Sequence, residues 1–169
     1  MEGPAKARIA AGTVMGAPFP CSIDMVGFGQ RARRPEVQAR AQQIGEDLGN
    51  PSMFMVAADS DDYTKGIGHR LKAFGELLAE GRLKVEDVTL VQVASPSRER
   101  VETYRQLRDE IEFTVGRING ASGTISHQAV SYLHHGFQRQ AMAALYLPAD
   151  VLLTQPLREC PNRPGPEPQ

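Results

Sequence analysis

The chain has 169 residues, of which 41% are hydrophobic and 23% charged, and its formal net charge is −1. This composition is typical of one globular domain with tails and excludes a disordered chain. The near-zero charge argues against nucleic-acid binding and against attraction to a membrane surface, so any anion site has to be local. With two cysteines, no apolar stretch near the ~20 residues of a membrane span and no signal-peptide core, we expect a cytoplasmic protein with free thiols.

The N-terminal part of the chain shows few signs of regular structure. Residues 1–17 are expected to form a loose segment, with one short strand near 13–17. Residues 27–34 contain three arginines and predict a basic, solvated connector. A helix is expected to begin at Pro35, which suits the first helical turn, and to end at a Gly-Asn-Pro sequence after Leu48.

The rest of the chain alternates short apolar runs with amphipathic segments. Strands are predicted at 52–58, 88–94, 129–134 and 150–154. Helices are predicted at 67–80, from Ser97 to Asn119-Gly120, and at 138–147. This order predicts an α/β fold with a doubly wound, mostly parallel Rossmann-like sheet and helices on both faces. The tail, 159–169, is proline-rich and is expected to be disordered.

The longest predicted helix has an apolar stripe that is expected to face the core. The residues of this stripe are Val101, Tyr104, Leu107, Ile111, Val115 and Ile118. Charged residues off this stripe, such as Arg108 and Asp109, are expected to form a solvated face.

Lys65 lies in the turn between the strand at 52–58 and the helix at 67–80. In an open parallel sheet this turn is where ligands bind, and a cation beside free helical N–H groups suits a phosphate. Taken alone, Lys65 is better explained as an exposed lysine at a helix start. Arg98, Phe137 and Glu159 follow the later strands and are expected at the same edge of the sheet as Lys65. Arg98 fits either a phosphate contact or a surface residue beside Ser97.

No metal site is predicted. Asp59, Asp61 and Asp62 share one short loop without a further carboxylate cluster, so they are expected to be solvated turn residues. His134 and His135 are adjacent at a strand end and point to opposite faces, which makes them a poor pair of ligands. The sequence also gives no argument for a Ser-His-Asp or Cys-His arrangement.

A series of motifs in the same order resembles the trehalose-6-phosphate synthases, the retaining enzymes of glycosyltransferase family twenty. The motifs are Asp62-Tyr63-Thr64-Lys65-Gly66-Ile67, Arg70-Leu71-Lys72-Ala73-Phe74, Val91-Gln92-Val93-Ala94, Pro96-Ser97-Arg98-Glu99-Arg100-Val101, Gly116-Arg117-Ile118-Asn119-Gly120, Tyr132-Leu133-His134, Asp150-Val151-Leu152-Leu153-Thr154 and Pro156-Leu157-Arg158. Pro18-Phe19-Pro20-Cys21-Ser22-Ile23-Asp24 also resembles the start of the family's second domain. The likeness covers residues 18–158.

The resemblance implies transfer of glucose from UDP-glucose to glucose 6-phosphate, with no other cofactor. The family has two Rossmann-like domains with the active site between them, and residues 18–158 resemble the front of the second, UDP-sugar-binding domain. By this resemblance Lys65 contacts the donor diphosphate, and Arg98 lies near the phosphate of the acceptor. Phe137 falls where the uracil ring is held, and Glu159 falls at the sugar end of the donor.

Several departures predict a truncated chain without a complete catalytic set. Ser60 stands where the family has an arginine, and Asp61 stands where it has leucine, which adds a carboxylate. Loss of one charged hydrogen-bonding partner costs about 1.5–3 kcal/mol of binding. Glu159 replaces an aspartate, and Cys160-Pro161 follows instead of the family's Gly-Met-Asn-Leu-Val-Ala-Lys-Glu. The first domain has no counterpart.

Two other functions stay open at this point. A sheet edge left uncovered predicts a non-catalytic interaction module whose protein partner is a glycosyltransferase. The second alternative is an enzyme that has the same fold but catalyses a different reaction, since a fold does not fix a function.

Overall fold

The computed structural model describes residues 5–9, 12–16, 24–97 and 101–155. The chain divides into two compact units, and the larger one spans Met25–Glu159. In the smaller unit, β1 (Ala5–Ile9) pairs antiparallel with β2 (Gly12–Gly16). The predicted strand near 13–17 is thus confirmed, whereas the expectation of a loose segment before it is wrong over Ala5–Ile9. Those residues alternate apolar and basic side chains, which is the period of a strand.

The larger unit consists of alternating strands and helices preceded by two helices. Its elements are α1 (Met25–Ala32), α2 (Pro35–Asp47), β3 (Met53–Ser60), the short 3₁₀ helix η1 (Tyr63–Lys65), α3 (Ile67–Ala79), β4 (Val88–Ser95), α4 (Glu102–Ser122), β5 (Val130–Leu133), α5 (Arg139–Tyr146) and β6 (Val151–Leu152). The strands pair in the order β5-β4-β3-β6, and every pair is parallel. The predicted parallel sheet is confirmed.

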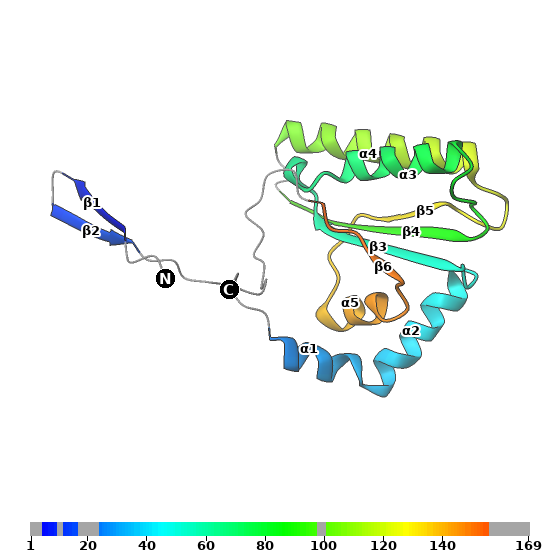
Figure 1. Cartoon of the computed structure of the whole chain (residues 1–169), viewed down its shortest axis with the longest axis horizontal. Coiled ribbons are helices and arrows are strands. Elements are labelled where there is room, and N and C mark those ends of the chain that lie inside the picture. The colour runs from blue at the N-terminus through cyan, green and yellow to red at the C-terminus, as the bar shows by residue number, and fades with distance from the viewer. Residues whose placement is uncertain (1–4, 10–11, 17–23, 98–100, 156–169) are drawn as a thin grey trace. The chain divides into compact units, whose positions relative to one another are not determined.

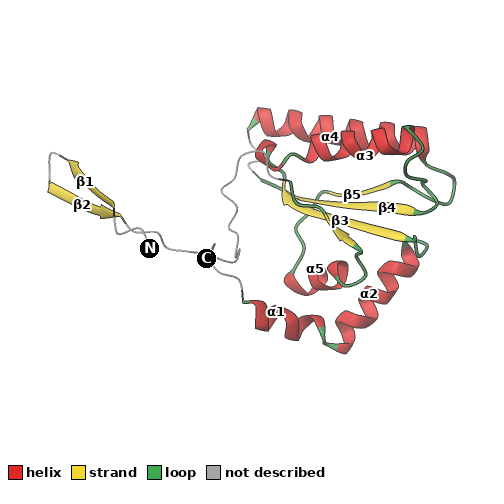
Figure 2. Ribbon diagram, in the orientation of Figure 1, coloured by secondary structure: helices red, strands yellow, loops and turns green. Residues whose placement is uncertain are grey.

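Helices cover both faces of this sheet, as the doubly wound prediction requires (Figure 1). On one face α3 and α4 pack against the sheet, with Leu71, Leu90 and Ile111 almost fully buried between them. On the other face α2 and α5 cover Phe54, Val56 and neighbouring apolar residues (Figure 2). The two central strands, β3 and β4, are therefore covered on both sides, which explains their continuous apolar runs.

α1 replaces the basic connector expected over 27–34. Phe28 and Ala32 on this helix pack against a small cluster that includes Val37 and Ala143. Ala143, on α5, lies far away in the sequence, so the local arginine-rich composition gave no sign of this packing. Tertiary contact has overridden local composition here.

The long helix α4 differs from its prediction at both ends. It begins at Glu102 rather than beside Ser97, and Val101 precedes it with an exposed side chain instead of lying in the core stripe. It also continues to Ser122, past the expected stop at Asn119. The Asn119 side chain bonds both the N–H and the C=O of Val130, at 2.9 and 2.8 Å, and so joins α4 to β5.

None of the described helices has both the length and the apolar character that crossing a membrane demands.

Candidate functional site

A hollow of about 270 Å³ lies at the C-terminal ends of β3 and β4, and we call it the Lys65 hollow. Its lining residues are Ala58, Asp59, Ser60, Lys65, Val93, Ser95, Phe137 and Met142. They come from β3, β4, η1, α5 and the loop before α5. The structure thus brings Lys65 and Phe137 to the same hollow, as their places after two parallel strands of one sheet, β3 and β5, predicted.

Local hydrogen bonds and one glycine fix the turn that carries Lys65. The Asp62 carboxylate accepts hydrogen bonds from the Thr64 N–H at 2.9 Å and from the Thr64 hydroxyl at 2.8 Å. It also accepts one from the Tyr104 hydroxyl on α4, at 3.2 Å. Gly66 then adopts a left-handed conformation, with φ of 69°, that turns the chain into α3. Lys65 is therefore held at a defined place beside the strand ends.

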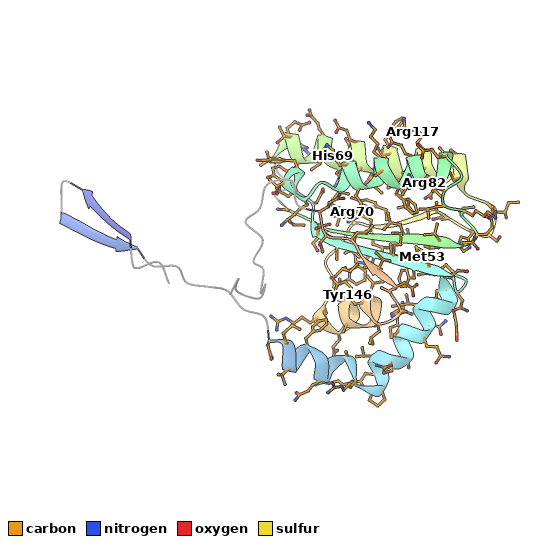
Figure 3. All side chains as sticks on the ribbon, viewed as in Figure 1. Met53, His69, Arg70, Arg82, Arg117 and Tyr146 are labelled. Carbon is orange, nitrogen blue, oxygen red and sulfur yellow. The ribbon has the colours of Figure 1, made fainter. Side chains whose placement is uncertain are left out.

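A buried arginine lies behind the Asp59 side of the hollow. Arg70 Nη1 lies 2.7 Å from Asp59 Oδ2 and 2.7 Å from Gln92 Oε1. Arg70 is only 3% exposed and lies between α3 and the sheet, whereas Arg117 projects from the outer side of α4 (Figure 3). The guanidinium offsets the negative charge of Asp59, which would otherwise repel an anion in the hollow.

Burial, together with the charge of Asp59, raises the pKa of Tyr146 on α5.

Asp61 does not behave as the solvated turn residue that was expected. It is 3% exposed, its N–H donates to the carbonyl of Ser95 at 2.8 Å, and His134 Nε2 lies 3.1 Å from its Oδ2. Burial raises the pKa of the Asp61 carboxyl, although His134 and Arg108 act in the opposite direction. Burial likewise raises the pKa of the neighbouring Tyr132. Asp59 was also expected to be solvated, and its ion pair with Arg70 corrects that expectation.

Phe137 lines a second hollow of about 410 Å³ on the α2 side of the sheet. The rings of His135 and Phe137 are 4.4 Å apart between centroids. Leu48, Leu133 and Leu145 contribute apolar lining. Phe137 therefore has polar groups of the Lys65 hollow on one side and an apolar space on the other.

Comparison with known proteins decides the family. The family model "Glycosyltransferase family 20" matches residues 4–163. The chain belongs to glycosyltransferase family 20. It is 51% identical over 144 residues to the trehalose-6-phosphate synthase of Mycobacterium avium, and this match covers 85% of the chain and 29% of that relative. The synthase of Mycobacterium tuberculosis is 46% identical over 156 residues, covering 92% of the chain and 31% of the relative.

Solved structures of the family share the fold. An α,α-trehalose-phosphate synthase (UDP-forming) from Burkholderia xenovorans in complex with glucose-6-phosphate matches with a TM-score of 0.84 and 26% identity, covering 94% of this chain and 34% of that one. A structure from E. coli bound with UDP-2-fluoro glucose has a TM-score of 0.78 at 24% identity, covering 92% and 36%, and adds evidence for the fold alone. This family 20 chain thus spans about a third of the length of the proteins it matches.

The other predicted site residues of this family 20 chain are Arg98 and Glu159, and both lie outside the described residues. Whether Arg98 shares the Lys65 hollow stays a prediction. The helix that was expected to begin at Ser97, next to Arg98, begins at Glu102 instead. Among the described residues, no group of three or more His, Cys, Asp or Glu side chains is arranged to hold a metal ion.

Sequence reasoning missed the partners that support the site, namely Arg70, Gln92 and His134. A signal for Arg70 was present, since it follows Ile67 by three residues and precedes Phe74 by four on the buried side of α3. An arginine on that side has to be paired, and the carboxylates of the preceding loop were the nearest candidates. Gln92 gave a weaker signal as the one amide in an apolar strand.

Proposed function

We propose that the chain carries the UDP-binding part of a trehalose-6-phosphate synthase, the enzyme that transfers glucose from UDP-glucose to glucose 6-phosphate. The observation that carries this proposal is the Lys65 hollow, where a lysine and an aromatic side chain meet at the C-terminal ends of parallel strands. Membership of family 20 and the names of its relatives support the same reaction.

Each residue of the hollow has a role in this proposal. The ammonium group of Lys65 contacts the diphosphate and offsets the negative charge that develops on UDP as the glycosidic bond breaks. Phe137 lies beside the uracil, where the apolar side of the second hollow offers space for a flat ring. Arg98 and Glu159 serve the acceptor phosphate and the glucose end of the donor, respectively. Because Ser60 supplies no guanidinium, the site binds UDP less tightly than an arginine-bearing site would.

Calorimetric titration of the 169-residue chain with UDP tests the proposal. Lys65→Ala is expected to raise Kd by about tenfold or more, because a hydrogen bond to a charged group contributes about 1.5–3 kcal/mol. Lys72→Ala is the matched control: it removes the same charge from an exposed position on α3 outside the Lys65 hollow. Absence of UDP binding at millimolar concentration, or equal affinity of the two variants, would overturn the proposal.

A second candidate is an interaction module whose partner is a complete family 20 glycosyltransferase. It is favoured by β6, which has two residues, pairs with β3 alone among the described strands, and exposes Leu152. An edge of this kind offers backbone groups to a strand from another chain. Sedimentation velocity of the chain mixed with the full-length Mycobacterium avium synthase tests whether the chain is such an interaction module. A joint, faster-moving boundary supports the module, and independent boundaries reject it.

A further inference from the structure

Asp61 and His134 connect the two loops that line the Lys65 hollow. Asp61 follows β3 and begins the turn that carries Lys65, whereas His134 follows β5 and begins the loop that carries Phe137. Their side chains meet at 3.1 Å although the residues are 73 positions apart in the sequence. β3 and β5 are not neighbours, because β4 lies between them. The contact therefore spans the end of β4, where the Asp61 N–H also bonds the carbonyl of Ser95.

Asp61 and His134 are each close in sequence to a residue that lines the hollow, Lys65 and Phe137 respectively. On one side, Asp61 is followed by Asp62, which caps the 3₁₀ turn that ends at Lys65. On the other side, His134 is followed by His135, whose ring lies against Phe137 at 4.4 Å. A shift of Asp61 relative to His134 would thus change the spacing of Lys65 and Phe137.

A contribution to the stability of the fold does not explain why a carboxylate is buried at position 61. Asp61 is 3% exposed, and its Oδ1 has no hydrogen-bond partner among the described residues. Arg108 and Glu112 on α4 and the hydroxyl of Tyr132 are the nearby polar groups, and burial raises the pKa of the Asp61 carboxyl. Replacing a buried polar pair by apolar side chains is often neutral or stabilising. The leucine that the family resemblance places at this position would avoid the cost of burying a carboxylate.

We propose that Asp61 and His134 are positioning residues that hold the Lys65 turn and the Phe137 loop at the spacing needed to bind UDP. The inference rests on the proposed function, since it assigns these two residues to the same hollow. With Asp61 ionised, a neutral His134 donates its Nε2–H to the carboxylate, so the contact needs no positive charge on the imidazole.

The test compares UDP affinity with thermal stability in three single variants and in the Asp61→Leu/His134→Phe double variant. Asp61→Leu removes the acceptor and is expected to raise the Kd for UDP three- to tenfold, the effect of one net hydrogen bond, without lowering Tm. Asp61→Asn keeps an acceptor oxygen and is expected to stay within twofold of the wild type. His134→Phe should match Asp61→Leu, and the double variant should be no weaker than either single one. Unchanged affinity in Asp61→Leu, or a loss that accompanies a lower Tm, would overturn the inference.

Amide hydrogen exchange without ligand separates this inference from the proposed function. If the wild type does not bind UDP, the proposed function fails, and the exchange rates alone decide whether the two loops are coupled. Asp61→Leu is expected to speed exchange at 62–66 and 135–137, while the buried amides of β4 keep their rates. Unchanged exchange in both loops would overturn the coupling as well.

Discussion

Ser60 stands where the family resemblance places an arginine. It lines the Lys65 hollow at the end of β3, so a longer side chain there has access to the ligand space. We predict that Ser60→Arg tightens UDP binding by about tenfold, because a guanidinium forms charge-assisted hydrogen bonds with diphosphate oxygens. Calorimetric titration measures the change. Ser52→Arg adds the same charge near the N-terminal end of β3, outside the hollow, and should leave Kd unchanged; weaker binding in Ser60→Arg would contradict the assignment.

Asp61 makes the stability of the chain depend on pH. Its pKa is raised in the folded protein above the ordinary value of 3.8, chiefly by burial. The stabilisation from this group is therefore complete below pH 3.8 and is lost as the pH rises through the raised pKa. We predict that the free energy of unfolding of Asp61→Asn, relative to the wild type, increases from pH 3.5 to pH 7. Urea unfolding followed by circular dichroism at each pH gives this difference, and a constant or falling difference would reject the prediction.

At the scale of elements, the junction between η1 and α3 depends on one glycine conformation. Gly66 has a φ of 69°, a region that L-residues rarely adopt, whereas Gly68 lies inside α3 with open space where a Cβ would stand. We predict that Gly66→Ala destabilises the chain by about 1 kcal/mol or more and that Gly68→Ala stabilises it by about 0.5–1 kcal/mol. Urea midpoints measure both changes. The same chemical substitution two residues apart thus has opposite expected signs, and equal signs would show that the φ at Gly66 is not the cause.

The strands of the sheet could be predicted from the sequence because each one is an apolar run bounded by polar turns. Parallel pairing followed from the alternation with helices, and it predicted that Lys65 and Phe137 lie at one end of the sheet. α1 escaped prediction since its partners, Val37 and Ala143, come from other elements. Val101 has the spacing of the α4 stripe, yet it lies before the helix and is exposed.

Charged residues were harder to place than apolar ones. Three carboxylates in one short turn have the composition of a solvated loop, but their side chains diverge. Asp59 meets Arg70, Asp61 meets His134, and Asp62 caps the next turn. Arg70 lies on the helix that follows Asp59, and its place on the buried side of α3 indicated a pairing. His134 lies 73 positions from Asp61, so the local sequence contained no sign of that contact. Spacing predicts which residues share an end of the sheet, whereas burial and pairing depend on the packed structure.

At the scale of the whole molecule, the central position of β3 and β4 determines where the site lies. Both strands have a neighbour on each side, and their C-terminal ends form the floor of the Lys65 hollow. The crossover from β5 through α5 to β6 passes over the other face of the sheet, so Phe137 reaches the hollow from the side opposite α3 and α4. The Lys65 hollow is thus lined from both sides of the sheet by residues of one chain.

By the proposed function, the Lys65 hollow is expected to bind UDP without catalysing the transfer of glucose. Retaining transfer requires donor and acceptor to be held together with water excluded, and positioning of this kind supplies several kcal/mol of the barrier reduction. The chain spans about a third of the length of its relatives, and Ser60 stands where the family resemblance places an arginine, so the proposed diphosphate contact has one cation fewer. We predict that the purified 169-residue chain forms no trehalose 6-phosphate from UDP-glucose and glucose 6-phosphate above the background of Lys65→Ala. Mass spectrometry of the product, with the full-length Mycobacterium avium synthase as the positive control, gives the answer. Product from the wild-type chain that disappears in Lys65→Ala would show that these residues suffice for catalysis.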